Sequence, residues 1–154
     1  MKTLLIGLGN PILTDDGVGI LVGREVKRQL SSVEFLEASL AGISLLEDIA
    51  GYDRVVIIDS IKTGKGALGE MYKLRLEDLG KVAAPSFAHG VGLRTAIELG
   101  KRLGYIIPES LEIYAIEVKD NTTFHEGCTS EIETRIPELA QRIVKNLRLE
   151  GIEN

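Results

Sequence analysis

The chain has 154 residues, which is the size of one ordinary domain and is long enough to bury a hydrophobic core. Hydrophobic residues make up 44% of it and charged residues 27%, so we expect a globular, soluble protein and exclude a disordered chain. The formal net charge of -5 at pH 7 disfavours nucleic-acid partners, because binding to a phosphate backbone normally requires a basic surface.

The first predicted elements are a strand and a helix. The short apolar run Leu4–Leu8 ends at Gly9-Asn10-Pro11, which is typical of a buried strand that enters a loop. This run is too short for the core of a signal peptide, and no run reaches the roughly 18 apolar residues of a membrane span. A helix follows, which Thr14 or Asp15 can cap. Its apolar residues recur with a helical period at Val18, Leu21, Val22, Val26 and Leu30.

The middle of the chain predicts two strands of different character. After a strand over Val33–Glu37 and a short helix over Ile43–Ile49, the segment Arg54–Asp59 contains four consecutive β-branched apolar residues, Val55–Ile58. Such an unbroken run suits a central parallel strand that is covered on both faces. Gly69–Leu76 alternates between polar and apolar side chains, so we place it at an edge of the sheet.

The second half of the chain continues the alternation of helices and strands. A helix follows His89, a strand is predicted over Leu111–Val118, and a long C-terminal helix over Ser130–Leu147. This order predicts an α/β fold, namely a three-layer α/β/α sandwich with a mostly parallel, twisted sheet and one antiparallel edge strand. Because the sequence has no internal repeat and no linker, we treat residues 1–154 as a single domain.

Polar residues follow several of the predicted strands. In open parallel sheets, ligands bind outside the carboxyl ends of the strands. This rule selects the loop Gly9–Asp16, Glu37, Asp59 and the segment Ser86–His89. Within these places Asp16, Asp59 and His89 supply two carboxylates and one imidazole, a set that suits nickel or zinc. Three protein ligands would leave positions on the metal open for substrate or water.

Each of these residues also has an ordinary structural explanation. Asp15 and Asp16 precede a helix, where acidic residues commonly act as caps. Asp59 could be an acidic residue in a turn, and a lone histidine such as His89 is often structural or exposed. The shared location of Asp16, Asp59 and His89 at one edge of the sheet is what favours the metal site.

The glycines of the first loop suggest a second interpretation, dinucleotide binding. Gly7-Leu8-Gly9 begins a G-x-G-x-x-G pattern after a strand, and Glu37 could mimic the acid that binds a ribose. The third glycine of the pattern is replaced by Ile12, however, and Asp15 and Asp16 would repel a pyrophosphate at the helix N-terminus. We therefore disfavour a dinucleotide site.

His125 and Cys128 form an H-x-x-C pair near the end of the chain. No second pair completes a zinc site, and nothing marks Cys128 as an activated thiolate, so we interpret it as a loop cysteine. As the only cysteine, it excludes an internal disulfide and is compatible with a reducing compartment. We expect a cytoplasmic protein without a membrane partner.

Taken in order, these residues resemble the hydrogenase maturation endopeptidases. The resemblance extends over nearly the whole chain and lies in Gly7-Leu8-Gly9-Asn10-Pro11-Ile12-Leu13-Thr14-Asp15-Asp16-Gly17-Val18-Gly19, the apolar strand that ends in Asp59, Ser86-Phe87-Ala88-His89, Ile116-Glu117-Val118 and Phe124-His125-Glu126-Gly127-Cys128-Thr129. It implies a phosphorylase/hydrolase-like α/β/α fold. It also implies that Asp16, Asp59 and His89 recognise nickel.

In that family the nickel belongs to the substrate. The resemblance implies that the protease senses nickel already installed in the precursor of a [NiFe]-hydrogenase large subunit and then cleaves off its C-terminal extension. Incomplete ligation by the cysteines of the precursor would leave the nickel able to accept two carboxylates and an imidazole. Cleavage would then depend on metal loading. We expect the protein to act as a monomer and to hold no permanent metal.

The chain departs from the family pattern after the second predicted strand. Many members carry an Asp-Gly-Gly-Thr stretch there, whereas this chain has Glu37-Ala38-Ser39-Leu40-Ala41-Gly42. Glu37 keeps a carboxylate, and we assign it the role of general base. Cys128 stands in place of the usual leucine, which is a smaller difference.

Two other functional classes remain as alternatives. Peptidyl-tRNA hydrolases also open with Gly-Leu-Gly-Asn-Pro, but they require a Tyr and a Thr-Arg-His-Asn stretch soon afterwards, and this chain has no histidine before His89. The acidic net charge further disfavours tRNA. The last alternative is a non-catalytic module that binds a metal or a partner.

Overall fold

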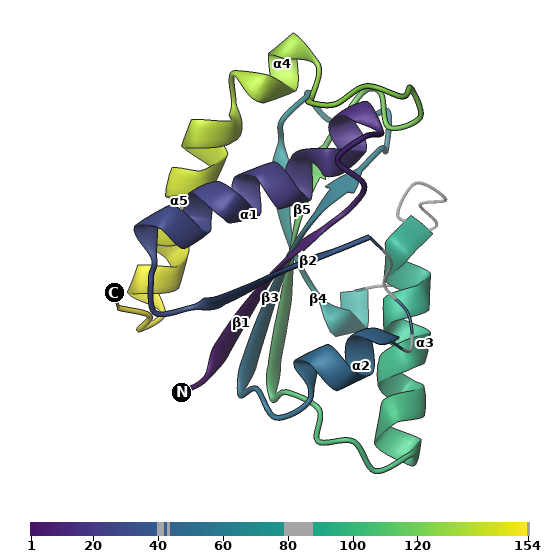
Figure 1. Cartoon of the computed structure of the whole chain (residues 1–154), viewed down its shortest axis with the longest axis vertical. Coiled ribbons are helices and arrows are strands. Elements are labelled where there is room, and N and C mark those ends of the chain that lie inside the picture. The colour runs from purple at the N-terminus through teal and green to yellow at the C-terminus, as the bar shows by residue number, and fades with distance from the viewer. Residues whose placement is uncertain (40–41, 43, 79–87, 154) are drawn as a thin grey trace.

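The computed structural model describes residues 1–39, 42, 44–78 and 88–153. Its centre is one five-stranded sheet with the strand order β2-β1-β3-β5-β4. Four strands are parallel, and only β4 pairs in the antiparallel sense, with β5. Helices cover both faces of the sheet, as Figure 1 shows. The predicted three-layer α/β/α sandwich with a mostly parallel sheet is therefore confirmed.

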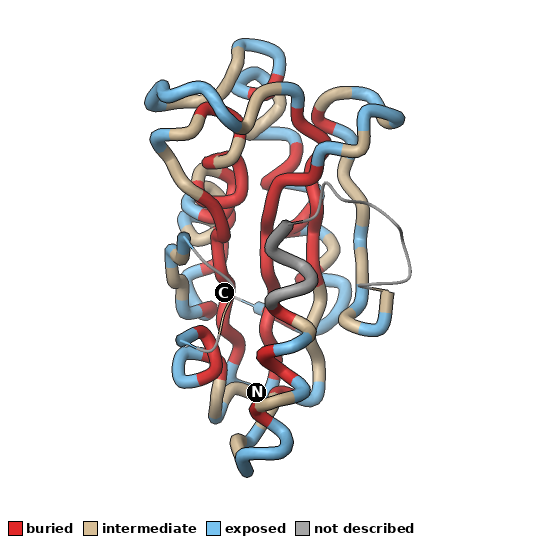
Figure 2. The backbone as a smooth tube through the Cα atoms, turned by 90° about the vertical axis from the view of Figure 1, so that its right-hand side faces the viewer, coloured by how far each residue is buried: buried red, intermediate tan, exposed pale blue. Residues whose placement is uncertain are grey.

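The central strands are the most apolar part of the chain. Every residue of β1 (Thr3–Leu8) and of β3 (Arg54–Ile61) is buried, and the last five residues of β5 (Ser110–Glu117) are buried as well. Figure 2 shows these strands as a buried centre between more exposed outer segments. The β-branched run in β3 thus forms a strand covered on both faces, as its composition predicts.

The edge strands are shorter and contain no fully buried residue. β2 (Glu34–Ala38) pairs with β1 at one edge of the sheet, and β4 (Met71–Arg75) pairs with β5 at the other. The predicted position of the alternating segment at an edge, and its antiparallel direction, are both correct. A short 3₁₀ turn, Leu76–Asp78, follows β4.

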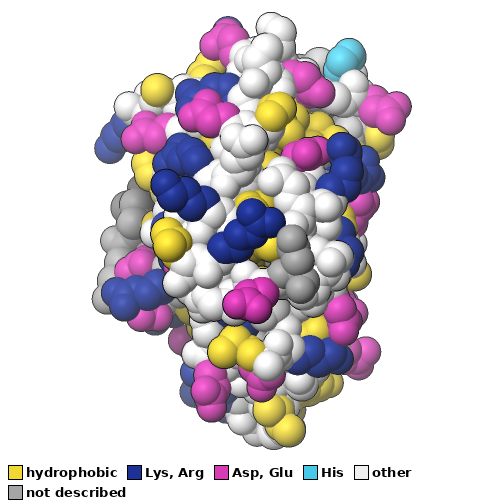
Figure 3. Space-filling view, turned by 90° about the vertical axis from the view of Figure 1, so that its left-hand side faces the viewer, with side chains coloured by type: hydrophobic (Ala, Val, Ile, Leu, Met, Phe, Trp, Pro, Cys, Tyr) yellow, Lys and Arg dark blue, Asp and Glu magenta, His cyan; other side chains and the backbone are white. Residues whose placement is uncertain are grey.

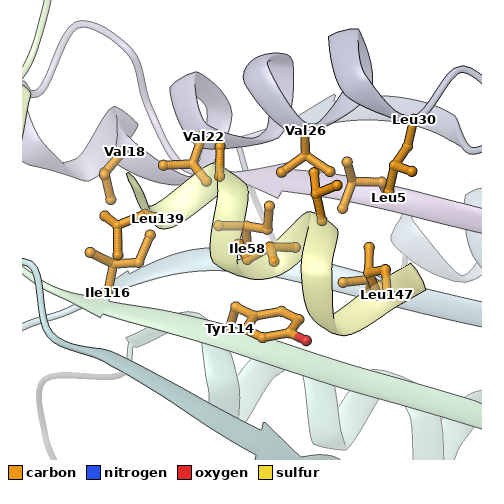
Figure 4. Close-up of a cluster of buried hydrophobic side chains, with 14 of the residues drawn as sticks. Leu5, Val18, Val22, Val26, Leu30, Ile58, Tyr114, Ile116, Leu139 and Leu147 are labelled. Atoms are coloured by element: carbon orange, nitrogen blue, oxygen red, sulfur yellow. The ribbon is translucent and has the colours of Figure 1, made fainter. Parts of the chain in front are cut away.

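Helices α1 (Val18–Gln29) and α5 (Ile136–Leu149) cover one face of the sheet. The apolar stripe of α1 meets α5 and the sheet, as Figure 4 shows for Val18, Val22 and Val26. Leu21, which the helical period also places on this stripe, is only half-buried. At the start of α1 the helix lies directly on the sheet. A Cβ at Gly19 would lie 2.2 Å from the carbonyl oxygen of Ile58 and 2.7 Å from that of Leu8.

Helices α2 (Ser44–Ile49) and α3 (Ala88–Arg102) cover the opposite face. Leu93, Ala96 and Ile97 of α3 are buried there, as their spacing predicts. They join a second core cluster with residues of α2 and the strands. This cluster includes Val55 and Ile57, so alternate residues of β3 belong to different faces.

The C-terminal helix differs from its prediction. The segment predicted as one helix over Ser130–Leu147 forms a short helix α4 (Ser130–Glu133) and the separate helix α5. Pro137 lies in the first turn of α5, where its missing N–H group leaves no hydrogen bond unmade. The proline therefore begins a helix here and does not continue the preceding one.

The amino end of the sheet carries an ion network. Arg54, which is nearly fully buried, contacts the carboxylates of Glu112 and Glu150, and Lys73 contacts the same two residues. Glu150 follows α5 directly, so the network fastens the end of α5 to β3, β4 and β5.

The charged side chains of the surface are mixed in sign. On the face shown in Figure 3, acidic and basic side chains are interspersed. None of the helices in the described ranges is both long and apolar enough to cross a membrane.

Candidate functional site

The first loop and the end of β3 meet at the carboxyl edge of the sheet. β1 and β3 are parallel neighbours, so the loop after Leu8 and the side chain of Asp59 emerge at the same edge. The loop folds tightly back on itself at Gly9, which has a φ of +146°. A Cβ at this position would lie 2.0 Å from the carbonyl oxygen of Asp16, so a side chain there would displace the Asp16 segment.

Asp16 lies in a 3₁₀ turn, Thr14–Gly17, which precedes α1. Its carboxylate is half-buried and accepts a hydrogen bond of 2.7 Å from the backbone N–H of Asn10 through Oδ2. Its Oδ1 atom accepts a longer hydrogen bond of 3.4 Å from the hydroxyl of Ser60. The side chain is thus oriented from two sides while part of it stays accessible.

Asp59 is completely buried and lies next to the same serine. The backbone N–H of Ser60 donates a hydrogen bond of 2.7 Å to Asp59 Oδ1. Ser60 therefore contacts both predicted ligands, Asp59 through its backbone and Asp16 through its hydroxyl. Sequence patterns do not reveal this role, because the serine is separated from Asp16 by 44 positions.

The third predicted ligand, His89, lies in the first turn of α3, and its side chain is outside the described residues. α3 covers the face of the sheet to which Val55 and Ile57 belong. Asp59, two residues after Ile57, belongs to this same face. The backbone of the helix start and Asp59 are thus on one side of the sheet. Within the described part of the chain, no three His, Cys, Asp or Glu side chains form a metal-binding group.

Asp15 has a different role from the predicted helix cap. The 3₁₀ turn and α1 both lack a side-chain cap, so the prediction that Thr14 or Asp15 caps the helix was wrong. The buried carboxylate of Asp15 instead accepts hydrogen bonds from the backbone of the loop that follows β5. The donors are the N–H groups of Lys119, Asp120 and Thr129, together with the Thr129 hydroxyl.

His125 and Cys128 do not form an active pair in this loop. Nδ1 of His125 lies 3.3 Å from the carbonyl oxygen of Gly127, and Cys128 is half-buried near the carbonyl oxygen of Thr14. Burial, together with the negative charges of Asp15 and Glu133, raises the pKa of the Cys128 thiol to about 12. The thiol is therefore neutral at physiological pH and is a poor nucleophile.

Glu37 lies inside β2 and forms an ion pair with Arg24 of α1. The guanidinium donates hydrogen bonds of 2.6 and 3.0 Å to the two carboxylate oxygens. These hydrogen bonds lower the pKa of Glu37, although partial burial opposes the shift. Its partner belongs to the α1 face of the sheet, whereas Asp59 belongs to the face covered by α3. The ion pair makes Glu37 a weaker base than a free carboxylate would be.

Comparisons with known proteins agree on one family. A family model described as hydrogenase maturation protease matches residues 20–146. The Hydrogenase 2 maturation protease of Escherichia coli is 30% identical, and the match covers 99% of this chain and 94% of that protein. The solved structure of the E. coli hydrogenase maturating endopeptidase HybD superposes with a TM-score of 0.80 at 28% identity, covering 99% of this chain and 96% of that one. The [NiFe] hydrogenase maturation protease HybD of Thermococcus kodakarensis shares the fold, with a TM-score of 0.71, 24% identity, and coverage of 96% and 99%.

Proposed function

Because the chain belongs to the hydrogenase maturation protease family, we propose that it removes the C-terminal extension from the precursor of a [NiFe]-hydrogenase large subunit after recognising nickel in that precursor. The observation that carries this proposal is the arrangement of Asp16 and Asp59 around Ser60 at the carboxyl edge of the sheet. The proposal places the protein in the cytoplasm, where the precursor would be made. It names no nucleic-acid or membrane partner.

Nickel enters this site as part of the substrate. A borderline divalent ion accepts imidazole nitrogen and carboxylate oxygen, which Asp16, Asp59 and His89 would supply. Three protein ligands do not fill the coordination sphere of nickel, so the ion could keep its bonds to the precursor while it binds here. A precursor without nickel would offer Asp16 and Asp59 no metal to ligate, which disfavours its binding.

The described residues alone do not form a complete hydrolytic apparatus. In the part of the chain that the structure describes, no serine or cysteine is hydrogen-bonded to a histidine, and the Cys128 thiol is neutral. The nickel of the substrate would therefore act as the Lewis acid or as the anchor that holds the scissile bond at the site. Asp16 and Asp59 bind and orient it.

Glu37 is our candidate for the base that takes a proton from the attacking water. Its carboxylate is held by Arg24 in the free protein, so it must leave this ion pair before it can act. If binding of the precursor separates Glu37 from Arg24, the Glu37 carboxylate would become available as a base only after the precursor has bound.

The decisive experiment compares nickel-loaded and nickel-free precursor. The protein should release one C-terminal peptide from the nickel-loaded precursor and leave the nickel-free precursor intact. Mass spectrometry measures both outcomes. Asp16→Asn should abolish the cut, because it removes a charged ligand at nearly constant shape. Asp53→Asn, at the amino end of the sheet, is the matched control and should cut normally. Equal cleavage of both precursors would overturn nickel recognition.

A further inference from the structure

Two large apolar side chains are exposed close to the candidate site. Ile12 is 51% exposed and lies four residues before Asp16. Phe124 is 81% exposed and belongs to the loop between β5 and α4. We call Ile12 and Phe124 the apolar rim. Leaving such side chains in water is unfavourable, and paired exposed apolar residues often mark a binding surface.

The backbone holds the two residues of the apolar rim next to each other. Leu13 and His125 form an isolated parallel β-bridge. The N–H of His125 donates to the carbonyl oxygen of Ile12 at 3.0 Å, and the N–H of Thr14 donates to that of His125 at 3.1 Å. Ile12 and Phe124 each precede one partner of the bridge, so they are neighbours in register. The bridge therefore holds the backbones of these two residues close together.

The apolar rim is joined rigidly to the candidate site. Thr14 donates a hydrogen bond to the carbonyl oxygen of Thr123, and the Asp15 carboxylate holds the N–H and hydroxyl of Thr129. Thr14 has a φ of +52°, which a β-branched residue rarely adopts. The surrounding contacts therefore stabilise Thr14 in an unfavourable backbone conformation and hold this loop in place. Figure 1 shows the loop beside the start of α1.

The remaining large apolar residues that are exposed lie elsewhere. They occur at the N-terminus, after α3 and at the end of α5, all at the amino end of the sheet. Among the described residues, only the apolar rim presents large exposed apolar side chains at the carboxyl edge. The other exposed residues are Met1, Leu103, Ile106 and Leu149.

We propose that the apolar rim binds an apolar side chain of the precursor next to the scissile bond and so contributes to the choice of substrate. This inference rests on the proposed function, because the occupant is the peptide that must reach Asp16 and Asp59 to be cut. Ile12 belongs to the same loop as Asp16, and this loop is bridged to the segment of Phe124, so an extended peptide whose nickel is held at Asp16 would lie beside the apolar rim. Burial of its apolar side chain against Ile12 and Phe124 would add affinity that the carboxylates cannot supply.

The test is the double variant Ile12→Ser/Phe124→Ser, compared with the matched control Ile106→Ser/Leu149→Ser at the other end of the sheet. The variant at the apolar rim should raise KM for nickel-loaded precursor by about tenfold and change kcat by less than about twofold, because it removes binding contacts and no ligand. Its affinity for free nickel, measured by calorimetry, should equal that of the wild type. The control should leave KM unchanged.

Several results would overturn the proposal. An equal rise of KM in the control, or a loss in kcat alone, would exclude a specific contact at the apolar rim. If the wild type formed a dimer in sedimentation experiments that the rim variant dissolved, the occupant would be a second copy of the chain. Failure of nickel recognition can be distinguished from failure of the rim proposal. If the wild type also cuts nickel-free precursor, KM of the wild type and of both variants can still be compared on that substrate. Thermal unfolding of both variants verifies that they fold.

Discussion

Arg54, at the start of β3, donates a hydrogen bond to Glu150, the residue that follows α5. Lys73 reaches the other oxygen of the same carboxylate at 2.5 Å. Burial raises the pKa of Glu150, but the hydrogen bonds and charges of Lys73 and Arg54 outweigh it, and the net shift is downward. Glu150 therefore contributes to the stability of the folded state through this network only while it is ionised.

Glu150→Gln should lower the free energy of unfolding at neutral pH by about 1 kcal/mol, because the pair is only partly exposed and Arg54 keeps Glu112 as a partner. A carboxylate with a lowered pKa in the folded state contributes stability above its unfolded pKa and loses it as the pH falls. The difference between wild type and variant should thus shrink below about pH 4 in urea unfolding. Glu138→Gln, which removes an ion pair with Arg135 at the start of α5, serves as control. A difference that grows on acidification would contradict this assignment.

Asp15→Asn should destabilise the protein more than the loss of a helix cap would. The buried carboxylate accepts hydrogen bonds from Lys119, Asp120 and Thr129, and an amide would turn an N–H group toward some of these donors. Unmade hydrogen bonds of buried groups cost about 1–3 kcal/mol each. We expect a lower Tm and faster hydrogen exchange at the Thr129 amide. An unchanged Tm would show that the loop is held by other contacts.

Free nickel should bind the isolated protein weakly, because few ligands displace its hydration shell. His89→Ala should weaken the binding further, and so should acidic pH, since a protonated imidazole cannot ligate. Titration calorimetry on both proteins tests the ligand assignment. Equal affinities would argue against His89 as a ligand.

Glu37→Gln should slow cleavage while leaving precursor binding intact if Glu37 is the base. Arg24→Gln provides the partner experiment, because it frees the carboxylate from its ion pair and should not impair cleavage. Single-turnover kinetics on loaded precursor measure both. Full activity in Glu37→Gln would remove this residue from the mechanism.

Cys128→Ser should retain cleavage. A thiol whose pKa is raised to about 12 by burial and neighbouring carboxylates should also react slowly with iodoacetamide at pH 8 in the folded protein. Mass spectrometry of the alkylated protein compares the alkylation rate of the folded protein with that of the protein unfolded in urea. Rapid alkylation of the folded protein would contradict the environment described here.

The fold was predictable because its signals are local. The run Val55–Ile58 indicates a doubly covered strand, and the alternation in Gly69–Leu76 indicates an edge, without knowledge of any partner. The break between α4 and α5 was missed because helical periodicity continues across it, although Pro137 marked the new start.

The candidate site was predictable only in part. The rule that ligands bind at the carboxyl edge selected Asp16 and Asp59, and both side chains contact Ser60 there. Their role as metal ligands stays a prediction. The contacts of Asp15 and Glu37 involve Thr129 and Arg24, which are distant in the sequence or on another element. No local pattern specifies such contacts. An aspartate that caps a helix and an aspartate that accepts hydrogen bonds from a distant loop can have the same neighbours in the sequence.

The hydrogen bond that Thr129 donates to Asp15 also has a consequence for how the site forms during synthesis. The two residues are 114 positions apart, so the loop that carries Asp16 lacks this anchor until Thr129 has been synthesised. Contacts of such long range form late in folding. A nascent chain that ends before Thr129 would therefore hold Asp16 only through its contacts with Asn10 and Ser60.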